Sequence, residues 1–487
     1  MAKFQEIKFY SQKKEKGYQL LPFKFSELDP NNYLLTNIAG EFLVLKKDLI
    51  RPLVEHQLDD SSEEYVNLRS RQFLQDTHNQ VAIDLLALKL RTRLVNLPQF
   101  TALHIFVVSL RCEHSCPYCQ VSRQSEDKTS FDMTNEMADK SLNLVFSSPS
   151  NMIKIEFQGG EPLLNFDIIR YVVQRAKEIN LQKNKTITFV IATNLALVDL
   201  EILHFCKDNN VHISTSLDGP EDLHNKNRPR PGKDSHQKAV NGINLSREIL
   251  GRDSVSALMT TTEASLGRVK EIIDEYLALD FGGIFLRHLS PYGFAIKTKT
   301  YLAYSTDRWL DFYKEGIEYI IELNKKGIDF REYHACTVLT KMLTSNNSGF
   351  VDLMNPAGIG IAAVVYNYDG AVYASDESRM LAEMGDDTFK LGNVLKNNYA
   401  EIFGSESLLT PLEESFTLSA PMCSDCAYEP YCGAEPVYHH GIHKDFLGRK
   451  PTSDFCHRNM SIFKYLLIRM REDSFVKTLF LNWANHS

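Results

Sequence analysis

From residue 103 to residue 289 the sequence alternates short apolar runs with stretches of helical periodicity, and this pattern constrains the fold more than any other feature. It predicts strands at 103–110, 152–158, 186–193, 211–217, 254–261 and 283–289. It predicts helices between them at 134–147, 165–179, 198–209, 235–250 and 265–279. Strands alternating with helices form parallel sheets, so we expect an α/β fold, a partial (β/α)6 barrel of the TIM type, with its site at the C-terminal ends of the strands.

Three cysteines follow the first predicted strand, at Cys112, Cys116 and Cys119, in a C-x3-C-x2-C spacing. A loop of this size can hold three corners of a [4Fe–4S] cube and leave the fourth iron open to a small molecule. Structural zinc or buried thiols are the alternative. Zinc prefers a closed set of four ligands, usually from paired C-x2-C units, so the triplet favours an open iron–sulfur cluster.

A second group of cysteines lies near the end of the sequence, at Cys423, Cys426, Cys432 and Cys456. Four thiolates form a closed set, which suits a second [4Fe–4S] cluster or zinc equally well. Cys206 and Cys336 stand alone, and we expect both to be packed thiols.

Length and composition bound the class of protein. A chain of 487 residues predicts two or three domains, and a net charge of −8 argues against nucleic-acid binding. No apolar run is long enough to cross a membrane, and the first residues lack the apolar segment of a signal peptide, so we expect a cytoplasmic protein. Because that compartment is reducing, clustered cysteines favour metal binding over disulfides.

The cysteine triplet, with Tyr118 before its last cysteine, resembles the signature of the radical S-adenosylmethionine (SAM) enzymes. The resemblance implies that SAM chelates the open iron. The stretch after the second predicted strand, Gln158-Gly159-Gly160-Glu161-Pro162, resembles the GGEP motif of that family. It implies that the backbone and Glu161 hold the amino group of SAM, and paired glycines allow a backbone to approach a ligand closely.

Further cofactor-binding candidates follow later predicted strands, at Thr193, Asn194, Ser216, Arg228 and Leu286. The stretch from Ser216 to Arg228 resembles the SLDGP-x3-H-x3-R pattern of peptide-modifying radical SAM enzymes. The resemblance implies that Ser216 bonds the ribose, that Arg228 pairs with a carboxylate and that Leu286 packs beside the adenine. The alternative for Asp218 is a turn-forming role, and for His224 a hydrogen bond to a carbonyl.

The C-terminal cysteines resemble the SPASM domain of radical SAM maturases, which carries two auxiliary [4Fe–4S] clusters. Positions equivalent to ligands of the first auxiliary cluster are Asn355, Ser375 and Pro436, none of them cysteine. We therefore expect two [4Fe–4S] clusters in all, one for SAM and one auxiliary. The resemblance to sulfatase-maturing relatives implies that Asp376 accepts a proton from the substrate; a solvated loop acid is the alternative.

Residues 1–98 read as a separate unit, with a hairpin at 33–45 and helices at 47–56, 63–73 and 80–94. Strands followed by helices resemble the winged-helix elements that hold a precursor peptide as an extra strand on a sheet edge. A plain cap on the catalytic domain is an equal alternative.

The predicted domains are an N-terminal peptide-recognition-like unit at 1–98, a radical SAM partial barrel at 99–292, a helical connection at 293–349 and a SPASM-like domain at 350–487. Residues from about 100 to 460 resemble radical SAM/SPASM maturases of ribosomally made peptides. Residues 21–25 and 37–42 resemble stretches of the His-Xaa-Ser system maturases.

The resemblance implies reductive cleavage of SAM and hydrogen abstraction from a precursor peptide by the 5′-deoxyadenosyl radical. A reductant such as flavodoxin or ferredoxin is an expected partner, and a paired maturase is a further candidate. Two alternatives remain: sulfatase-type oxidation of a protein Ser or Cys, and a non-catalytic peptide-binding protein whose cysteines hold zinc.

Overall fold

The computed structural model describes residues 17–76, 81–125, 127–346 and 349–485. Contacts within the chain divide it into two compact units. Unit 1 comprises Met1–Val95 and Pro421–Tyr431, and unit 2 comprises Asn96–Ala420 and Cys432–Ser487. In the described parts of both units, no helix is long and apolar enough to cross a membrane.

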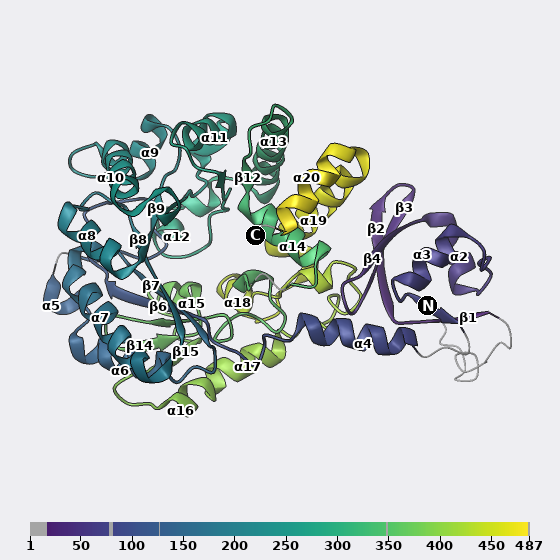
Figure 1. The fold of residues 1–487 in the computed structure, drawn as a ribbon, viewed down its shortest axis with the longest axis horizontal. Helices are drawn as coiled ribbons and strands as arrows, with labels where there is room; N and C mark the ends of the chain where they lie inside the picture. Colours follow the sequence, from purple (N-terminus) through teal and green to yellow (C-terminus); the bar gives the residue numbers. More distant parts are fainter. Residues whose placement is uncertain (1–16, 77–80, 126, 347–348, 486–487) are drawn as a thin grey trace. The chain divides into compact units, whose positions relative to one another are not determined.

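Unit 2 is built on one eight-stranded sheet with the order β10-β9-β8-β7-β6-β13-β14-β15 (Figure 1). Its strands are β6 (Leu103–Ser109), β7 (Met152–Gly159), β8 (Thr186–Thr193), β9 (Val211–Ser216), β10 (Val255–Leu258), β13 (Ala363–Tyr366), β14 (Ala371–Tyr373) and β15 (Lys390–Asn393). Strands β6 to β10 and β13 run parallel, whereas β14 and β15 add antiparallel neighbours. The expected α/β fold with a mainly parallel sheet is confirmed.

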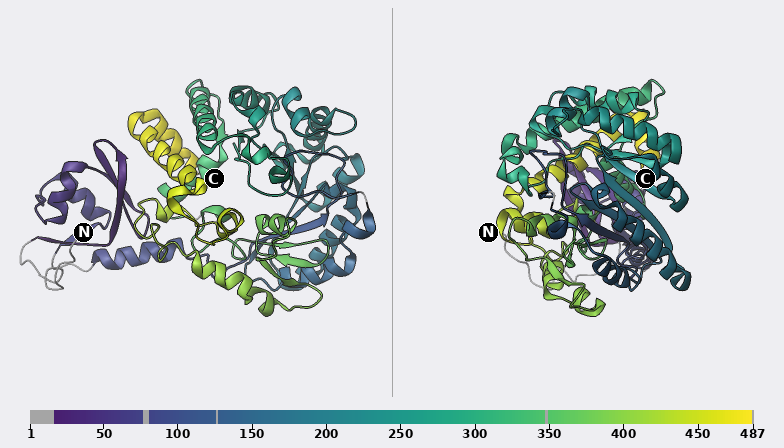
Figure 2. Two further views of the ribbon diagram at one scale, coloured as in Figure 1. Left: turned by 180° about the vertical axis from the view of Figure 1, so that it is seen from behind. Right: turned by 90° about the vertical axis from the view of Figure 1, so that its left-hand side faces the viewer.

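Helices connect the parallel strands along the outside of the sheet, as the blue and teal segments show in Figures 1 and 2. They are α6 (Asn135–Val145), α7 (Phe166–Lys183), α8 (Leu200–Asn209), α10 (Ser235–Leu250) and α11 (Val269–Ala278). Side chains cap two of them: Thr134 accepts an N–H of α6, and Asp199 accepts one of α8. Their apolar faces pack on the strands in one core that includes Leu142, Phe157 and Val172.

The predicted sixth strand at 283–289 is wrong in its length. Strand β11 covers only Gly283–Ile284 and pairs with β12 (Arg331–Glu332) in a separate two-stranded sheet. Side chains satisfy the backbone beyond it: Glu332 accepts the Leu286 N–H at 3.0 Å, and the Tyr304 hydroxyl accepts the Leu289 N–H at 3.2 Å. Because these N–H groups already have partners, this stretch does not need a strand ladder.

The remaining helices of unit 2 are α5 (Lys128–Phe131), α9 (Glu221–Asn227), α12 (Phe294–Lys297), α13 (Thr306–Lys325), α14 (Tyr333–Leu343), α15 (Asp376–Ala382), α16 (Tyr399–Phe403), α17 (Glu406–Glu414), α18 (Pro436–His443), α19 (Asp454–Glu472) and α20 (Ser474–Asn485). Helix α14 packs on α20, and α13 on both α11 and α19. The two isolated cysteines are buried, Cys206 at 0% and Cys336 at 3% exposure, as expected of packed thiols.

Unit 1 has an antiparallel sheet of order β2-β3-β4 and a separate pair of β1 with β5. Its elements are β1 (Tyr18–Leu20), β2 (Phe23–Asp29), β3 (Asn32–Asn37), β4 (Phe42–Lys46), α2 (Lys47–Val54), α3 (Glu63–Ser70), β5 (Leu74–Asp76) and α4 (Val81–Arg93). The expected hairpin is the β3–β4 pair. The predicted start of the last helix, at residue 80, lies outside the described residues. The likeness to a winged helix stays a prediction.

The segment Pro421–Tyr431 belongs to unit 1 through specific contacts. Lys24 forms an ion pair with Glu429 at 2.7 Å, and the Thr36 hydroxyl donates to the Ala427 carbonyl at 2.7 Å. The buried Tyr431 hydroxyl donates to the Gly40 carbonyl at 2.9 Å. A short piece of the C-terminal region therefore folds with the N-terminal sheet.

Candidate active site

The cysteine triplet lies on the loop that leaves β6, at the C-terminal edge of the parallel strands. Cys112, Cys116 and Cys119 are half-buried and form no disulfide. Two backbone hydrogen bonds hold the loop: the Ser115 N–H donates to the Pro229 carbonyl at 2.8 Å, and the Phe294 N–H donates to the Cys119 carbonyl at 2.7 Å. The loop is thus positioned by its backbone, which leaves the three thiols to serve as ligands.

Burial affects the chemistry of these thiols. It raises the pKa of Cys112 well above its usual value and that of Cys116 to about 12. A bound metal stabilises the thiolate that burial disfavours. Three partly accessible thiols on one fixed loop therefore fit a cluster, in contrast to the fully packed Cys206 and Cys336.

The glycine pair Gly159-Gly160 brings the end of β7 against the start of the cysteine loop. A Cβ at Gly159 would lie 1.9 Å from the Ser109 oxygen, and one at Gly160 would lie 2.2 Å from the Arg111 oxygen. The Gly160 N–H donates to Ser109 at 2.8 Å and the Glu161 N–H to Arg111 at 2.7 Å. The close approach that glycine permits here is to the chain's own backbone, and it fixes Glu161 beside the cysteines.

Glu161 is fully buried and accepts three hydrogen bonds. They come from the Leu163 N–H at 3.0 Å, the Thr193 hydroxyl at 2.6 Å and the Asn194 N–H at 2.8 Å. Burial, followed by the nearby charge of Glu113, raises the pKa of Glu161 to about 7. A cation beside this carboxylate would favour its charged form, so the residue fits the ammonium group that the resemblance to the GGEP motif implies for it.

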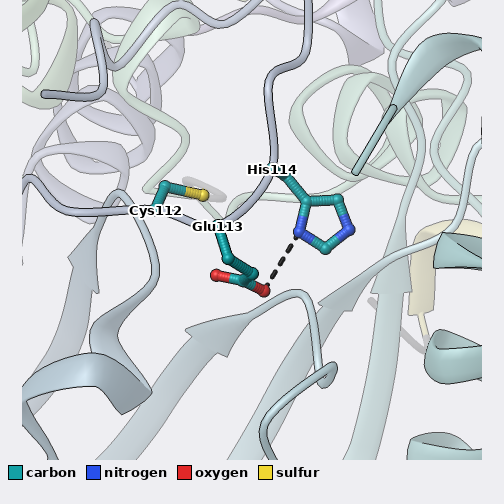
Figure 3. Close-up of side chains that lie close together, drawn as sticks. All are labelled: Cys112, Glu113 and His114. Atoms are coloured by element: carbon teal, nitrogen blue, oxygen red, sulfur yellow. Dashed lines mark hydrogen bonds and ion pairs between the residues drawn. The ribbon is translucent and has the colours of Figure 1, made fainter. Parts of the chain in front are cut away.

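Glu113 was missed by sequence reasoning, although it stands inside the cysteine motif. The Asn194 side-chain amide donates to Glu113 Oε1 at 2.8 Å, and His114 Nδ1 lies 3.0 Å from the same oxygen (Figure 3). Its Oε2 is buried and has no hydrogen-bond partner among the residues that the structure describes. Cys112, Glu113 and His114 place their potential ligand atoms within 4.8 Å of one another. The only signal in the sequence is a charged residue directly after a cysteine.

Tyr118 and Arg228 meet on the fully buried carboxylate of Asp218. The Tyr118 hydroxyl donates to Asp218 at 2.6 Å, and Arg228 pairs with both carboxylate oxygens at 3.0 and 3.1 Å. Burial alone would raise the pKa of Asp218, but the guanidinium holds it below its usual value. Asp218 thus does more than shape a turn: it joins the cysteine loop to α9 through a buried ion pair.

This ion pair changes the interpretation of two predictions. The carboxylate that Arg228 clasps in the structure is the chain's own Asp218, so its role toward a cofactor stays a prediction. Among the described residues His224 forms no side-chain hydrogen bond to a carbonyl; its Nδ1 accepts the Asp218 N–H at 3.3 Å. Both residues therefore support the position of Asp218.

The other predicted cofactor residues are dispersed. Gln158 donates to Glu156 at 2.8 Å, and Pro162 begins a short 3₁₀ turn. Ser216 is the last residue of β9. Leu286 is buried and lines a cavity that Ser216 and the cysteine loop do not reach. The structure therefore gathers the cysteine, GGEP and Thr193-Asn194 elements into one site and leaves Leu286 on a neighbouring wall.

The four C-terminal cysteines are all half-buried. Cys423 and Cys426 belong to unit 1, and Cys432 and Cys456 belong to unit 2. Within unit 2 the Asn459 amide approaches the Cys432 sulfur at 3.8 Å, and the Cys456 N–H is capped by Ser453 at 3.2 Å. A closed set of four thiolates stays a prediction.

The three positions that the resemblance aligns with ligands of a first auxiliary cluster have local structural roles. Ser375 forms a capping box with Ser378 at the start of α15, with hydrogen bonds of 3.2 and 2.8 Å. Pro436 opens α18, and Asn355 accepts the Thr417 N–H at 3.2 Å. Each residue supports the backbone in a way that a cysteine ligand would not.

Asp376 begins α15 and is half-buried. Its Oδ1 has no hydrogen-bond partner in the described part of the chain, and Arg379 lies 3.9 Å away. Burial raises the pKa of Asp376 to about 6. A carboxyl group shielded in this way is suited to accept a proton, although the role itself stays a prediction.

Comparisons with known proteins show which families and structures this chain resembles. Residues 106–276 match the radical SAM superfamily. A cysteine-type anaerobic sulfatase-maturating enzyme of Clostridium novyi is 24% identical over 74% of this chain and 94% of its own length. An uncharacterized protein of Methanocaldococcus jannaschii is 28% identical over 38% of this chain, which spans only 62% of that relative.

Solved structures share the fold. The structure of native anSMEcpe with bound AdoMet superposes with a TM-score of 0.64 at 20% identity, over 80% of this chain and all of the other. SuiB of Streptococcus suis, bound to its precursor peptide SuiA, superposes with a TM-score of 0.53 at 14% identity, over 89% of this chain and 98% of the other. Residues 106–276 therefore match a radical SAM domain, and the chain has the fold of the solved structures of anSMEcpe and SuiB.

Proposed function

We propose that this protein is an enzyme that cleaves SAM reductively and modifies a ribosomally made precursor peptide. The observation that carries the proposal is the meeting of the three-cysteine loop with Glu161 and Asn194 at the ends of parallel strands. A reduced [4Fe–4S] cluster would supply one electron to SAM, whose cleavage would give methionine and the 5′-deoxyadenosyl radical that removes a hydrogen atom from the peptide.

The chain's own residues position these reactants. Cys112, Cys116 and Cys119 would hold the cluster, while Glu161 would orient the ammonium group of SAM. The buried ion pair between Asp218 and Arg228 steadies Tyr118 within the loop. Asp376 would accept a proton from the substrate after hydrogen abstraction.

The proposal is tested by anaerobic incubation of the reconstituted protein with SAM and dithionite. We expect 5′-deoxyadenosine and methionine in equal amounts, measured by liquid chromatography and mass spectrometry. Reactions without protein or without reductant are the controls. If the complete reaction forms no more 5′-deoxyadenosine than these controls, the proposed activity is wrong.

A sulfatase-type maturase is the second candidate, because the Clostridium novyi relative aligns over 94% of its length. The absence of cysteine at Ser375 and Pro436 favours the peptide maturase. Assays with sulfatase-derived peptides, read for the mass change at Cys or Ser, separate the two. We also propose flavodoxin or ferredoxin as the reductant and a paired maturase as a further partner. A cytoplasmic location belongs to the same proposal, since an oxygen-sensitive cluster needs reducing surroundings.

Unit 1 is proposed to hold the precursor peptide on the edge of β4. In the described part of this unit, β4 pairs with β3 alone. The Asn37 N–H donates to Glu41 at 3.1 Å and the Lys47 N–H to Asn31 at 2.9 Å. Because hydrogen-bonded pairs alternate in antiparallel sheets, Val44 directs its N–H away from β3. That N–H is open to an added strand.

Substitution Val44→Pro should therefore remove one donor of the open edge and leave the β3 ladder intact, since proline is tolerated on edge strands. We expect affinity for a precursor peptide encoded beside the gene to fall about tenfold, measured by fluorescence polarisation, because one hydrogen bond and the strand geometry are lost. The matched control Val44→Thr keeps the N–H and should bind like wild type. If the proline variant binds the peptide as tightly as wild type, the β4 edge does not hold the peptide, and unit 1 would only cover the catalytic domain.

A further inference from the structure

Unit 2 contains a cavity of about 360 Å³ beside the proposed active site. Leu258, Leu286 and Ser290, which end or follow β10 and β11, form part of its wall. Among the predicted cofactor-binding residues, only Leu286 lines it. The cavity is therefore separate from the cysteine loop and from Glu161, and its size is that of a small-ligand site.

The lining is rich in aromatic side chains. They are Phe285, Tyr292, Trp309, Phe350, Tyr438 and Phe455. Tyr292 and Trp309 are 1% and 2% exposed, and their Oη and Nε1 atoms have no hydrogen-bond partner within the described chain. Such faces attract both alkyl chains and cations. The walls thus suit a long side chain with an apolar stem and a charged or polar end.

The charged groups on the wall do not balance. Of the four carboxylates, Glu156 pairs with Lys154 at 3.0 Å and Glu377 with Arg287 at 3.9 Å. Arg458 is the remaining cation of this wall; its charge and that of Arg287 act on Asp352, and no ion pair joins Arg458 to Asp352 or Glu435 among the described residues.

Glu435 shows most directly that a partner is missing. It is 5% exposed, its Oε2 accepts the Tyr438 N–H at 2.7 Å, and its Oε1 has no partner among the residues described. Burial, followed by like charges nearby, raises the pKa of Asp352 to about 7 and that of Glu435 well above its usual value. An unpaired buried carboxylate is costly, and an added cation relieves the cost.

We propose that this cavity receives a basic side chain, lysine or arginine, of the peptide substrate, and that Asp352 and Glu435 bind its positive charge. The inference rests on the proposed function and names its substrate class. Glu377, on the same wall, directly follows Asp376, the predicted proton acceptor. A basic residue held here would therefore anchor the peptide beside the reacting position.

Trp309 gives a direct readout of occupancy, because the chain has only two tryptophans. The cluster-reconstituted protein is titrated with N-acetyl-lysine N-methylamide, its arginine counterpart, the uncharged norleucine analogue and the anionic glutamate analogue, and tryptophan fluorescence is followed. We expect both basic probes to bind at least tenfold more tightly than the norleucine probe. The Trp309→Phe variant, which keeps Trp483, should lose the signal.

The double variant Asp352→Asn with Glu435→Gln should bind the basic and norleucine probes within about threefold of each other. Asp387→Asn, which removes an exposed carboxylate of the same unit, is the matched control and should keep the full preference. Circular dichroism checks folding; if the double variant does not fold, Glu435→Gln alone is used and should reduce the preference at least threefold.

Equal affinity of wild type for lysine and norleucine probes, or a preference for glutamate, would overturn the proposal. So would an undiminished preference in a folded carboxylate variant, or an undiminished signal in Trp309→Phe. SAM cleavage is measured on the same samples. Failure to cleave SAM with basic-probe binding intact refutes the proposed activity alone, whereas cleavage without basic-probe preference refutes this inference alone.

Discussion

Replacement of Cys116 by alanine is expected to abolish formation of 5′-deoxyadenosine, a loss of at least about a hundredfold, because a three-thiolate site leaves no spare ligand for its cluster. The fold should survive. The loop is held by the backbone bonds from Ser115 to Pro229 and from Phe294 to Cys119, and neither uses the Cys116 side chain. Product analysis under reducing, anaerobic conditions measures the effect, and circular dichroism measures the fold.

The matched control is Cys206→Ala, which removes a thiol from the interior of unit 2. It should cost some stability through the small cavity that it leaves, but SAM cleavage should stay within about twofold of wild type. If the Cys116 variant cleaves SAM at the wild-type rate, the triplet does not hold the reactive cluster.

The parallel strands were predictable because their residues alternate with helical stretches in a regular way. Strands β6 to β9 lie within two residues of their predicted ends. The predicted length of the sixth strand was wrong because the N–H groups of Leu286 and Leu289 donate to side chains. These acceptors, Glu332 and Tyr304, follow later in the chain. Local sequence carries no signal for such partners.

Strand β13, the second neighbour of β6 in the sheet, was also not predicted from the sequence. Strand β13 is a four-residue apolar segment more than 250 residues after β6, yet it pairs with β6 in parallel. Nothing in so short a run distinguishes a strand from a buried turn. Its place in the sheet follows from tertiary pairing alone.

At the candidate active site, the spacing of residues along the sequence predicted which side chains of a single loop lie together. The cysteine triplet and the GGEP stretch are of this kind, because each motif lies within a few residues. The clasp of Arg228 on Asp218 and the contact of Asn194 with Glu113 join different elements. Those pairings needed the structure, and they show that Arg228 and Asn194 already bind side chains of the chain.

The C-terminal cysteines show that domain boundaries could not be predicted from the sequence alone. The sequence groups all four within the predicted domain 350–487, whereas the contacts assign Pro421–Tyr431, with Cys423 and Cys426, to unit 1. Lys24, Thr36 and Gly40 hold that segment. Deleting residues 1–95 would therefore remove its partners as well, so a point substitution such as Val44→Pro is the cleaner test of unit 1.

Substitution Cys426→Ala is expected to lose about half of the iron, from about eight to about four atoms per chain. The number of available thiolates sets this iron content. Three cysteines would serve the SAM cluster, and the four C-terminal cysteines would fill every corner of one auxiliary cube. Cys206 and Cys336 are buried at 0% and 3% exposure, and two thiolates cannot hold a third cluster of this type.

A closed auxiliary cluster has no open iron for SAM, so loss of Cys426 should abolish peptide product while uncoupled SAM cleavage continues. Iron, sulfide and zinc are measured on anaerobically reconstituted protein, with Cys336→Ala as the control that keeps the full iron content. About twelve iron atoms in wild type would contradict the count, because Ser375 and Pro436 offer no thiolate to a third cluster. Zinc at the C-terminal cysteines would instead leave a single cluster and make the second site purely structural.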